Sequence, residues 1–126
     1  MMRVSVKMYR TDCLAEEEEL LVEAIGILNG DRILYKEDEK KGYVQTVVFH
    51  DDRILIERKA DVNTLVFLSR KNSHSRVSSE YGEMKLEAHL VGCEKKENEW
   101  TVEYRILNGN DVAVHQKIVW KFQPVN

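Results

Sequence analysis

The sequence predicts an all-β protein, and within that class an antiparallel up-and-down barrel of about eight to ten strands. Apolar and polar residues alternate with period 2 along most of the chain, which is typical of strands with one buried face. Turn signals separate these stretches about every ten residues, and no segment reads as a helix long enough to join parallel strands. The single proline, Pro124, leaves the preceding chain open to long strands. Because closure removes exposed strand edges, we prefer a barrel to a sandwich.

The composition is that of one globular domain spanning residues 1–126, with 43% hydrophobic and 33% charged residues. The net charge of −3 argues against a nucleic-acid partner, since nucleic-acid-binding domains usually carry a basic excess. No apolar run approaches the roughly 20 residues that span a bilayer, and the N-terminus lacks the features of a signal peptide. We therefore expect a cytoplasmic protein with no membrane contact. Cys13 and Cys93 stand far apart in the sequence and are expected to be reduced thiols.

The N-terminal part of the chain contains one clear strand and one ambiguous segment. Residues 1–10 alternate cleanly between apolar and polar side chains and predict a strand. Residues 16–25 suit a helix by propensity, whereas the apolar residues that follow favour β structure. We favour a strand over residues 18–28, with Gly26 as a bulge or a point of close packing.

Turn signals place the remaining elements. Asn29-Gly30 and Asn108-Gly109 predict tight hairpins, because Asn-Gly accepts the two positive φ angles of a type I′ turn. Residues 37–42 read as a charged connection, and residues 69–80 as either a loop or a strand that is polar on both faces. The other strands are predicted over residues 32–37, 43–49, 53–59, 64–68, 84–91, 100–106 and 112–122.

The same alternation predicts which side chains are buried. Large aromatic residues fall mostly on inward faces and are expected in the core rather than in a ligand-stacking site; they are Tyr81, Trp100, Tyr104, Trp120 and Phe122. Four apolar residues fall on the opposite faces, namely Leu34, Val47, Phe49 and Val66. Together these four predict an exposed apolar patch, which usually marks an interaction surface.

Several short motifs together resemble the YwiB-like family of uncharacterised bacterial proteins. They are the turn at 29–31 followed by Ile33-Leu34-Tyr35-Lys36-Glu37, the stretches 46–49 and 52–58 with Thr64, and Ser79-Glu80-Tyr81-Gly82 followed by Met84-Lys85-Leu86 and two long closing strands. The resemblance covers residues 2–122 and implies a calycin-like barrel, similar in shape to lipocalins, with residues 16–25 in a strand. It implies no known activity. The family usually has Thr-Pro-Tyr-Gly where this chain has Ser79-Glu80-Tyr81-Gly82, so a rigid turn is not expected there.

No sequence motif for catalysis or metal binding is present. The chain lacks the nucleophile-elbow, phosphate-loop and dinucleotide-binding patterns. Glutamates cluster at 16–19 and 37–39, where we expect solvated charge rather than a catalytic pair. None of the histidines lies at the spacing of a metal-binding motif; they are His50, His74, His89 and His115. We therefore expect a protein that is not an enzyme, with no catalytic residue, no metal site and no cofactor.

The polar segment 69–80 suggests a candidate ligand-binding site. If it is a strand, every second residue shares one face. Arg58 occupies the face of Ile54 and Ile56, which should point inward, and an interior arginine is costly unless it is paired or solvated. A wet, partly polar lumen removes that cost. The candidate ligand-binding residues are Arg58, then His74, Arg76 and Ser78 on one face of the segment, and Tyr81 at its end. The alternative is that Arg58 reaches solvent at a strand end and that the segment is an exposed loop or edge.

Two hypotheses about function follow. The first is a non-enzymatic barrel that binds a small polar or anionic molecule in its open mouth. The second is a protein-interaction or structural module that acts through its outer surface or a homodimer interface. A cavity of about a few hundred Å³ supports the first, whereas a filled interior beside an apolar outer patch supports the second.

Overall fold

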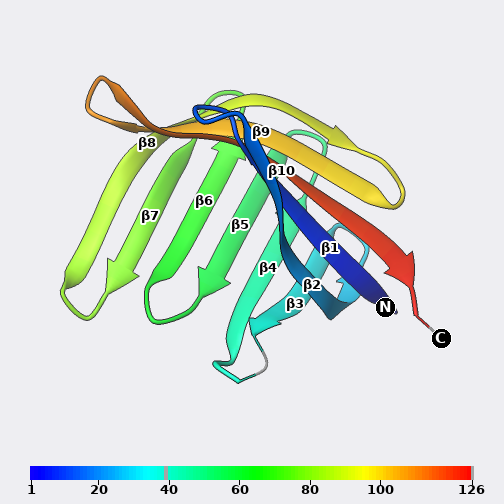
Figure 1. Cartoon of the computed structure of the whole chain (residues 1–126). Helices are drawn as coiled ribbons and strands as arrows, with labels where there is room; N and C mark the ends of the chain where they lie inside the picture. Colours follow the sequence, from blue (N-terminus) through cyan, green and yellow to red (C-terminus); the bar gives the residue numbers. More distant parts are fainter. Residues whose placement is uncertain (39, 126) are drawn as a thin grey trace.

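The computed structural model, which describes residues 1–38 and 40–125, is a closed β-barrel (Figure 1). Its strands are β1 (Met2–Asp12), β2 (Glu17–Asn29), β3 (Arg32–Asp38), β4 (Tyr43–Phe49), β5 (Arg53–Lys59), β6 (Asn63–Ser69), β7 (His74–Ser79), β8 (Gly82–Lys95), β9 (Glu99–Asn108) and β10 (Asp111–Pro124). Each strand pairs antiparallel with its neighbour in sequence, and β10 pairs with β1 to close the barrel. The predicted fold class and up-and-down topology are confirmed.

The uncertain segments of the sequence resolve as strands. Residues 16–25, for which a helix was the alternative, lie mostly in β2. The polar segment 69–80 is a turn followed by β7. Glu39, in the charged connection predicted over 37–42, lies outside the described residues. In the part of the chain that the structure describes, no helix is long and apolar enough to cross a membrane.

The two Asn-Gly hairpins form where predicted but with a different turn type. Asn29 pairs with Arg32, so Gly30 and Asp31 are the central residues, and only Gly30 has a positive φ, of 61°. The β9–β10 turn repeats this pattern with Gly109 at φ 66°. A positive φ at the first central position alone is typical of a type II′ turn, which needs glycine there. The prediction of type I′ turns was therefore wrong.

Gly26 in β2 is a point of close packing, one of the two predicted alternatives. A Cβ at this position would lie 2.8 Å from the Leu34 carbonyl oxygen and 3.1 Å from both the Tyr35 Cβ and the Val6 Cγ2. The bulge of β2 lies elsewhere: Met8 pairs with Val22 but the next residue, Tyr9, pairs with Leu20. Glycine is required at position 26 because the interior rows of β1 and β3 meet there.

The core fills the end of the barrel where β1 begins and β10 ends, which we call the closed end. Both chain ends lie there (Figure 1), and the Val125 N–H donates to the Arg3 carbonyl at 3.1 Å. The Trp100 ring centroid lies 5.4 Å from that of Phe49 and 4.8 Å, edge-on, from that of Phe122. These rings and the buried aliphatic residues around them pack this end of the interior, and we call the opposite end the mouth end.

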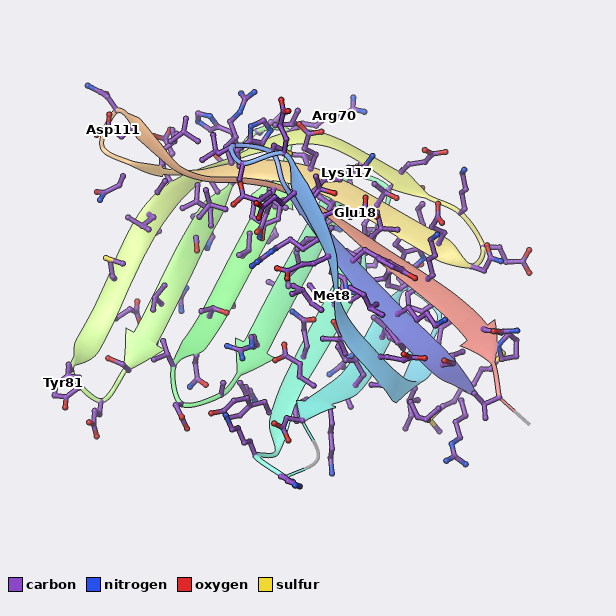
Figure 2. The ribbon with its side chains drawn as sticks, in the orientation of Figure 1. Met8, Glu18, Arg70, Tyr81, Asp111 and Lys117 are labelled. Carbon is purple, nitrogen blue, oxygen red and sulfur yellow. The ribbon has the colours of Figure 1, made fainter. Side chains whose placement is uncertain are left out.

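The predicted exposed apolar patch is wrong for three of its four members. Val47, Phe49 and Val66 are core residues, and only Leu34 is exposed. Both faces of β4 carry apolar residues, so its alternation did not distinguish inside from outside. Among the aromatic residues expected in the core, Trp100, Tyr104, Trp120 and Phe122 are buried, as predicted. Tyr81 is the exception, because it is 92% exposed at the β7–β8 turn (Figure 2).

Candidate ligand-binding mouth

A cavity of about 400 Å³ opens at the mouth end of the barrel. Its apolar floor includes Met8, Ile56, Val66 and Ile118, which also belong to the core. Its polar lining consists of Arg10, Glu37, Gln45, Arg58, Thr64, Tyr104 and Gln116. We call this space the mouth cavity. Its size lies within the range of about 300 to 1,000 Å³ that is usual for small-molecule sites.

The interior rows of several strands change from apolar to polar at the same end. Val4, Val6 and Met8 lead to Arg10 on β1, and Ile54 and Ile56 lead to Arg58 on β5. The equivalent polar positions elsewhere are Glu37 on β3, Gln45 on β4, Thr64 on β6, Tyr104 on β9 and Gln116 on β10. Because neighbouring strands run in opposite directions, these positions gather at one end. The sequence therefore builds a dry half and a polar half into one barrel.

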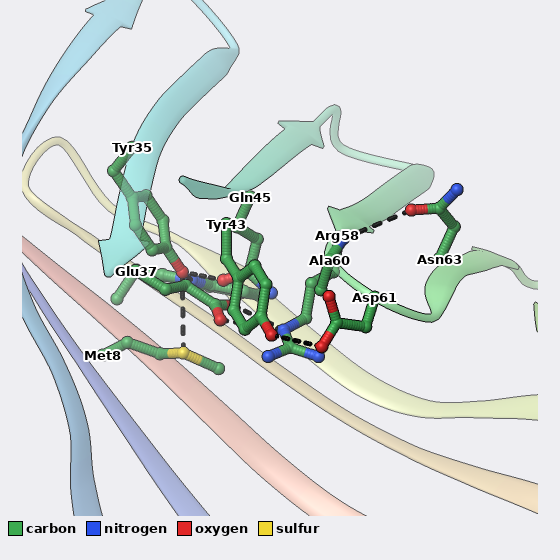
Figure 3. A network of polar contacts seen from close by, with 10 residues as sticks. Met8, Tyr35, Glu37, Tyr43, Gln45, Arg58, Ala60, Asp61 and Asn63 are labelled. Carbon is green, nitrogen blue, oxygen red and sulfur yellow. Dashed lines mark hydrogen bonds and ion pairs between the residues drawn. The ribbon is translucent and has the colours of Figure 1, made fainter. Parts of the chain in front are cut away.

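Arg58 is held in the wall of the mouth cavity by Glu37 (Figure 3). The Arg58 Nε donates toward both carboxylate oxygens of Glu37, at 3.0 and 2.8 Å. Glu37 is the extra residue of a bulge, since Lys36 pairs with Val44 while Asp38 pairs with Tyr43. The Arg58 guanidinium also lies 5.4 Å from the centre of the Tyr43 ring. Within the described residues only the Nε of Arg58 is hydrogen-bonded, so its terminal NH₂ groups can bind a ligand.

A buried hydrogen-bond network separates the mouth cavity from the closed end. The Trp120 Nε1–H donates to the Tyr35 hydroxyl at 3.1 Å. That hydroxyl donates in turn to the Gln45 Oε1 (Figure 3). The Met8 sulfur lies 3.5 Å from the Tyr35 hydroxyl oxygen. Burial raises the pKa of Tyr35, so its hydroxyl stays a neutral donor. The network fixes the Gln45 side chain, which forms part of the cavity lining.

The opposite wall presents an amide and a phenol. The Gln116 side-chain NH₂ donates to the Tyr104 hydroxyl oxygen. A phenol hydroxyl can accept one hydrogen bond and still donate its proton in another, so Tyr104 can donate a hydrogen bond to an acceptor group of a ligand in the cavity. Burial raises the pKa of Tyr104, which keeps that proton in place at neutral pH. Nearby, Arg10 lies at the rim, where its Nη2 is 2.6 Å from Glu19 Oε1.

Of the residues predicted for the site, the structure brings only Arg58 to the mouth cavity. Ser75 pairs with the core residue Val66, so Ser75 points inward and His74, Arg76 and Ser78 point outward. The prediction that these three share one face is confirmed, but that face is the outer surface, so grouping them with Arg58 in the lumen was wrong.

The four remaining predicted residues have their own surroundings on the outside. The His74 ring lies 5.6 Å from that of Phe67. The Arg76 Nε is 3.6 Å from Glu83 Oε1, and the Ser78 hydroxyl lies 3.5 Å from the other oxygen of that carboxylate. Tyr81 stands at the tip of the β7–β8 hairpin, pointing away from the barrel (Figure 2). None of these contacts reaches the mouth cavity.

Known proteins support the fold and leave the activity open. Residues 5–118 match the family model described as "Domain of unknown function (DUF1934)". The crystal structure of ywiB protein from Bacillus subtilis is similar, with a TM-score of 0.59 and 11% sequence identity, covering 99% of this chain and 92% of that chain. At this identity the likeness concerns the fold alone. No curated protein matches the sequence. The chain therefore belongs to the DUF1934 family of unknown function and has a YwiB-like β-barrel fold.

Proposed function

We propose that this protein is a non-enzymatic barrel that binds a small polar molecule in its mouth cavity. The observation that carries the proposal is the combination of a cavity of about 400 Å³, an apolar floor and a polar wall in one place. A ligand with an apolar part and one or two acceptor groups fits this lining. The floor takes the apolar part, while Arg58 and Tyr104 supply donors.

The charges of the lining favour a neutral or singly anionic ligand. The lining holds the cations Arg10 and Arg58 and the anion Glu37. Glu37 already neutralises Arg58, and Glu19 pairs with Arg10 at the rim, so neither arginine of the lining is left without an anion. A cationic ligand would find both carboxylates, Glu37 and Glu19, already paired with arginines. A carboxylate or carbonyl group can instead take the free NH₂ groups of Arg58.

Binding is favoured over catalysis by the state of the titratable groups. General acid–base work needs a group whose pKa lies near neutral pH and which can exchange a proton with substrate. Glu37 faces a permanently charged arginine, and the pKa of Tyr104 is raised by burial. Both oxygens of Glu37 are engaged by Arg58, and the raised pKa of Tyr104 keeps its proton away from exchange near neutral pH. A cytoplasmic location is proposed on the two free thiols, one of them the exposed Cys93, which suit a reducing compartment.

Native mass spectrometry of the protein purified from its own cells tests the proposal. We expect a retained small mass that disappears on denaturation. Arg58→Ala and Gln116→Leu should lower its occupancy, whereas Arg76→Ala, an arginine of the outer face, should leave it unchanged. Equal loss in all three variants would contradict binding in the mouth cavity. A second result would also contradict it: the protein carries no bound mass, and no compound of a polar metabolite library raises its melting temperature at millimolar concentration. A ligand that saturates the folded state should raise that temperature, because it stabilises the folded state.

A homodimer through the outer surface is the second candidate, and one observation favours it. Ile25, Ile27 and Leu34 form an exposed apolar strip across β2 and β3, with exposures of 48%, 45% and 37%. A hollow of about 570 Å³ on the same face is lined by these residues together with Met1, Arg3 and Lys36. A dimer should show twice the chain mass in light scattering, and Ile27→Lys should return it to the monomer. A monomer at high concentration contradicts this candidate.

A further inference from the structure

Three potential metal ligands from separate elements meet on the outer surface near the mouth end. They are the Cys13 thiol in the β1–β2 turn, the Glu103 carboxylate on β9 and the His115 imidazole on β10. Their ligand atoms all lie within 4.8 Å of one another. The His115 Nε2 is 2.8 Å from the Glu103 Oε2. We call these residues the thiol–imidazole–carboxylate cluster.

The sheet register explains why these side chains converge. The Cys13 N–H donates to the His115 carbonyl at 2.9 Å, which continues the β1–β10 ladder by one residue beyond Asp12. Cys13 therefore sits opposite His115, on the same face of the sheet. On β9, the partner of His115 is Arg105, so Glu103 is its diagonal neighbour. Each of the three backbones is thus fixed by strand pairing before any ion arrives.

We propose that this cluster binds a divalent transition-metal ion, with Zn²⁺ as the best match. A thiolate, an imidazole and a carboxylate are all zinc ligands, at about 2.3, 2.0 and 2.1 Å. Around a tetrahedral ion with those bond lengths, the ligand atoms would lie about 3.3 to 3.6 Å apart. The ligand atoms of the cluster lie at most 4.8 Å apart, which exceeds these separations by about 1.5 Å or less. Three protein ligands leave the fourth position to water.

The surroundings of the cluster set how strongly it can hold a cation. His115 and Glu103 are partly shielded, with side-chain exposures of 18% and 33%. The thiolate and the carboxylate together match the charge of a divalent ion. Asp12 adds negative charge nearby, whereas Lys117 and Arg105 oppose the ion. The site is thus predicted to be weaker than a closed four-ligand zinc site, and to stay accessible to exchange.

Ligation of a metal ion at this cluster requires the thiolate form of Cys13. The thiol must lose its proton to ligate, and burial followed by the charges of Glu103 and Asp12 raises the pKa of Cys13. Lys117 and Arg105 act in the opposite direction but do not outweigh the burial. The imidazole of His115 must also be neutral.

Titration of the intact chain with Co²⁺ and Zn²⁺ tests the site. Co²⁺ bound to a thiolate gives a charge-transfer absorption in the near ultraviolet, which reports the sulfur ligand directly. We expect one equivalent of Co²⁺ to produce it and Zn²⁺ to displace it. Cys13→Ser should abolish the band, and His115→Asn should weaken Zn²⁺ binding by at least about 10-fold, the smallest effect usual for loss of a supporting partner.

Two matched controls separate this cluster from ordinary surface binding. Cys93→Ser removes the other thiol, which is exposed. His89→Asn removes a histidine whose Nε2 lies 3.2 Å from Glu87 Oε1, a similar pair without a thiol. Both should bind Zn²⁺ like the wild type. The proposal is overturned if no band forms, if the band survives Cys13→Ser, or if the controls weaken binding as much as His115→Asn. Circular dichroism in the presence of EDTA checks that each variant is folded.

Discussion

The Nε of Arg58 on β5 lies 2.8 Å from one carboxylate oxygen of Glu37 on β3, with the whole of β4 between the two strands. The two partners differ in their access to water. The Glu37 side chain is 14% exposed and that of Arg58 is 38% exposed. Such an ion pair is energetically asymmetric, because removal of one partner destabilises the fold more when the charge that remains is the more buried one.

Arg58→Met should therefore destabilise the fold more than Glu37→Gln. The first leaves a largely buried carboxylate without its cation, at a cost of about 1 to 3 kcal/mol. The second leaves a guanidinium that can still reach water and the Tyr43 ring, at a cost of less than about 1 kcal/mol. Urea unfolding of both variants and of the double variant measures this. Equal effects of the two single variants would contradict the predicted asymmetry, and effects that add within about 0.5 kcal/mol in the double variant would show that the pair is not coupled.

Much of the fold could be predicted from the sequence because period 2 is visible in almost every strand. The strands that contain Trp100, Trp120 and Phe122 have one apolar face, and the burial of these three side chains was predicted correctly. Alternation did not predict the inward face of a strand whose two faces have the same polarity. β4 is apolar on both faces, and β7 is polar on both, so neither sequence indicates which face points inward. Pairing with β6, which puts Ser75 beside Val66, decides the matter for β7.

The candidate site was harder to predict because its contacts are distant in the sequence. Glu37 and Arg58 are 21 residues apart, and Tyr35 and Trp120 are 85 apart. A bulge turns Glu37 toward Arg58, and no local signal marks it. One signal was available: the inward rows end in Arg10, Arg58 or Gln116 at the same end of the meander. Combining that pattern with the predicted topology would have located the mouth cavity.

The hydroxyl of Tyr35 is expected to contribute strongly to stability. It accepts from the Trp120 N–H and donates to Gln45 inside the barrel. Tyr35→Phe leaves both partners buried and unsatisfied, so we expect a loss of about 1 to 3 kcal/mol. Tyr43→Phe is a matched control, since the Tyr43 hydroxyl donates to Asp61 at 2.7 Å on the exposed surface. It should cost at most about 0.5 kcal/mol, because water replaces the lost partner. Similar urea midpoints for the two variants would contradict this prediction.

Trp120 should be among the most sensitive core positions. Its side chain is fully buried and its indole N–H is satisfied by Tyr35. Trp120→Ala removes a large apolar volume and leaves a cavity, with an expected loss of about 3 to 5 kcal/mol. The measurement is the free energy of unfolding in urea, with circular dichroism as the signal. A midpoint close to that of the wild type would mean that Trp120 is not part of the core.

Acid should weaken the β2–β3 turn through Asp31. Lys95 donates to its carboxylate, and His50 Nδ1 lies 2.8 Å from the other oxygen. The hydrogen bond from Lys95, followed by that from His50, lowers the pKa of Asp31 in the folded state. A lowered pKa means stability that is present above the unfolded pKa of about 3.9 and is lost as the pH falls through the folded value.

Asp31→Asn should therefore destabilise the protein at pH 7 and have a smaller effect near pH 3. Urea midpoints of the wild type and the variant at both pH values measure the difference. Asp111→Asn, at the exposed β9–β10 turn (Figure 2), provides the control and should shift the midpoint equally little at both. A deficit of Asp31→Asn that persists unchanged in acid would show that the carboxylate charge does not support the turn.

Gly26 and Gly92 offer a matched pair for testing close packing. A methyl group at position 26 would lie 2.8 Å from the Leu34 carbonyl oxygen, which is backbone and cannot move aside cheaply. Gly26→Ala should therefore cost about 1 to 3 kcal/mol, as other overpacked sites do. Gly92 in β8 has nothing within 4 Å of its virtual Cβ and no positive φ. Gly92→Ala should be neutral or stabilise by up to about 1 kcal/mol, because alanine restricts the unfolded chain. Equal shifts of the two variants in thermal melts would mean that strand propensity determines the effect. The contact between β2 and β3 at Gly26 would then not constrain the barrel.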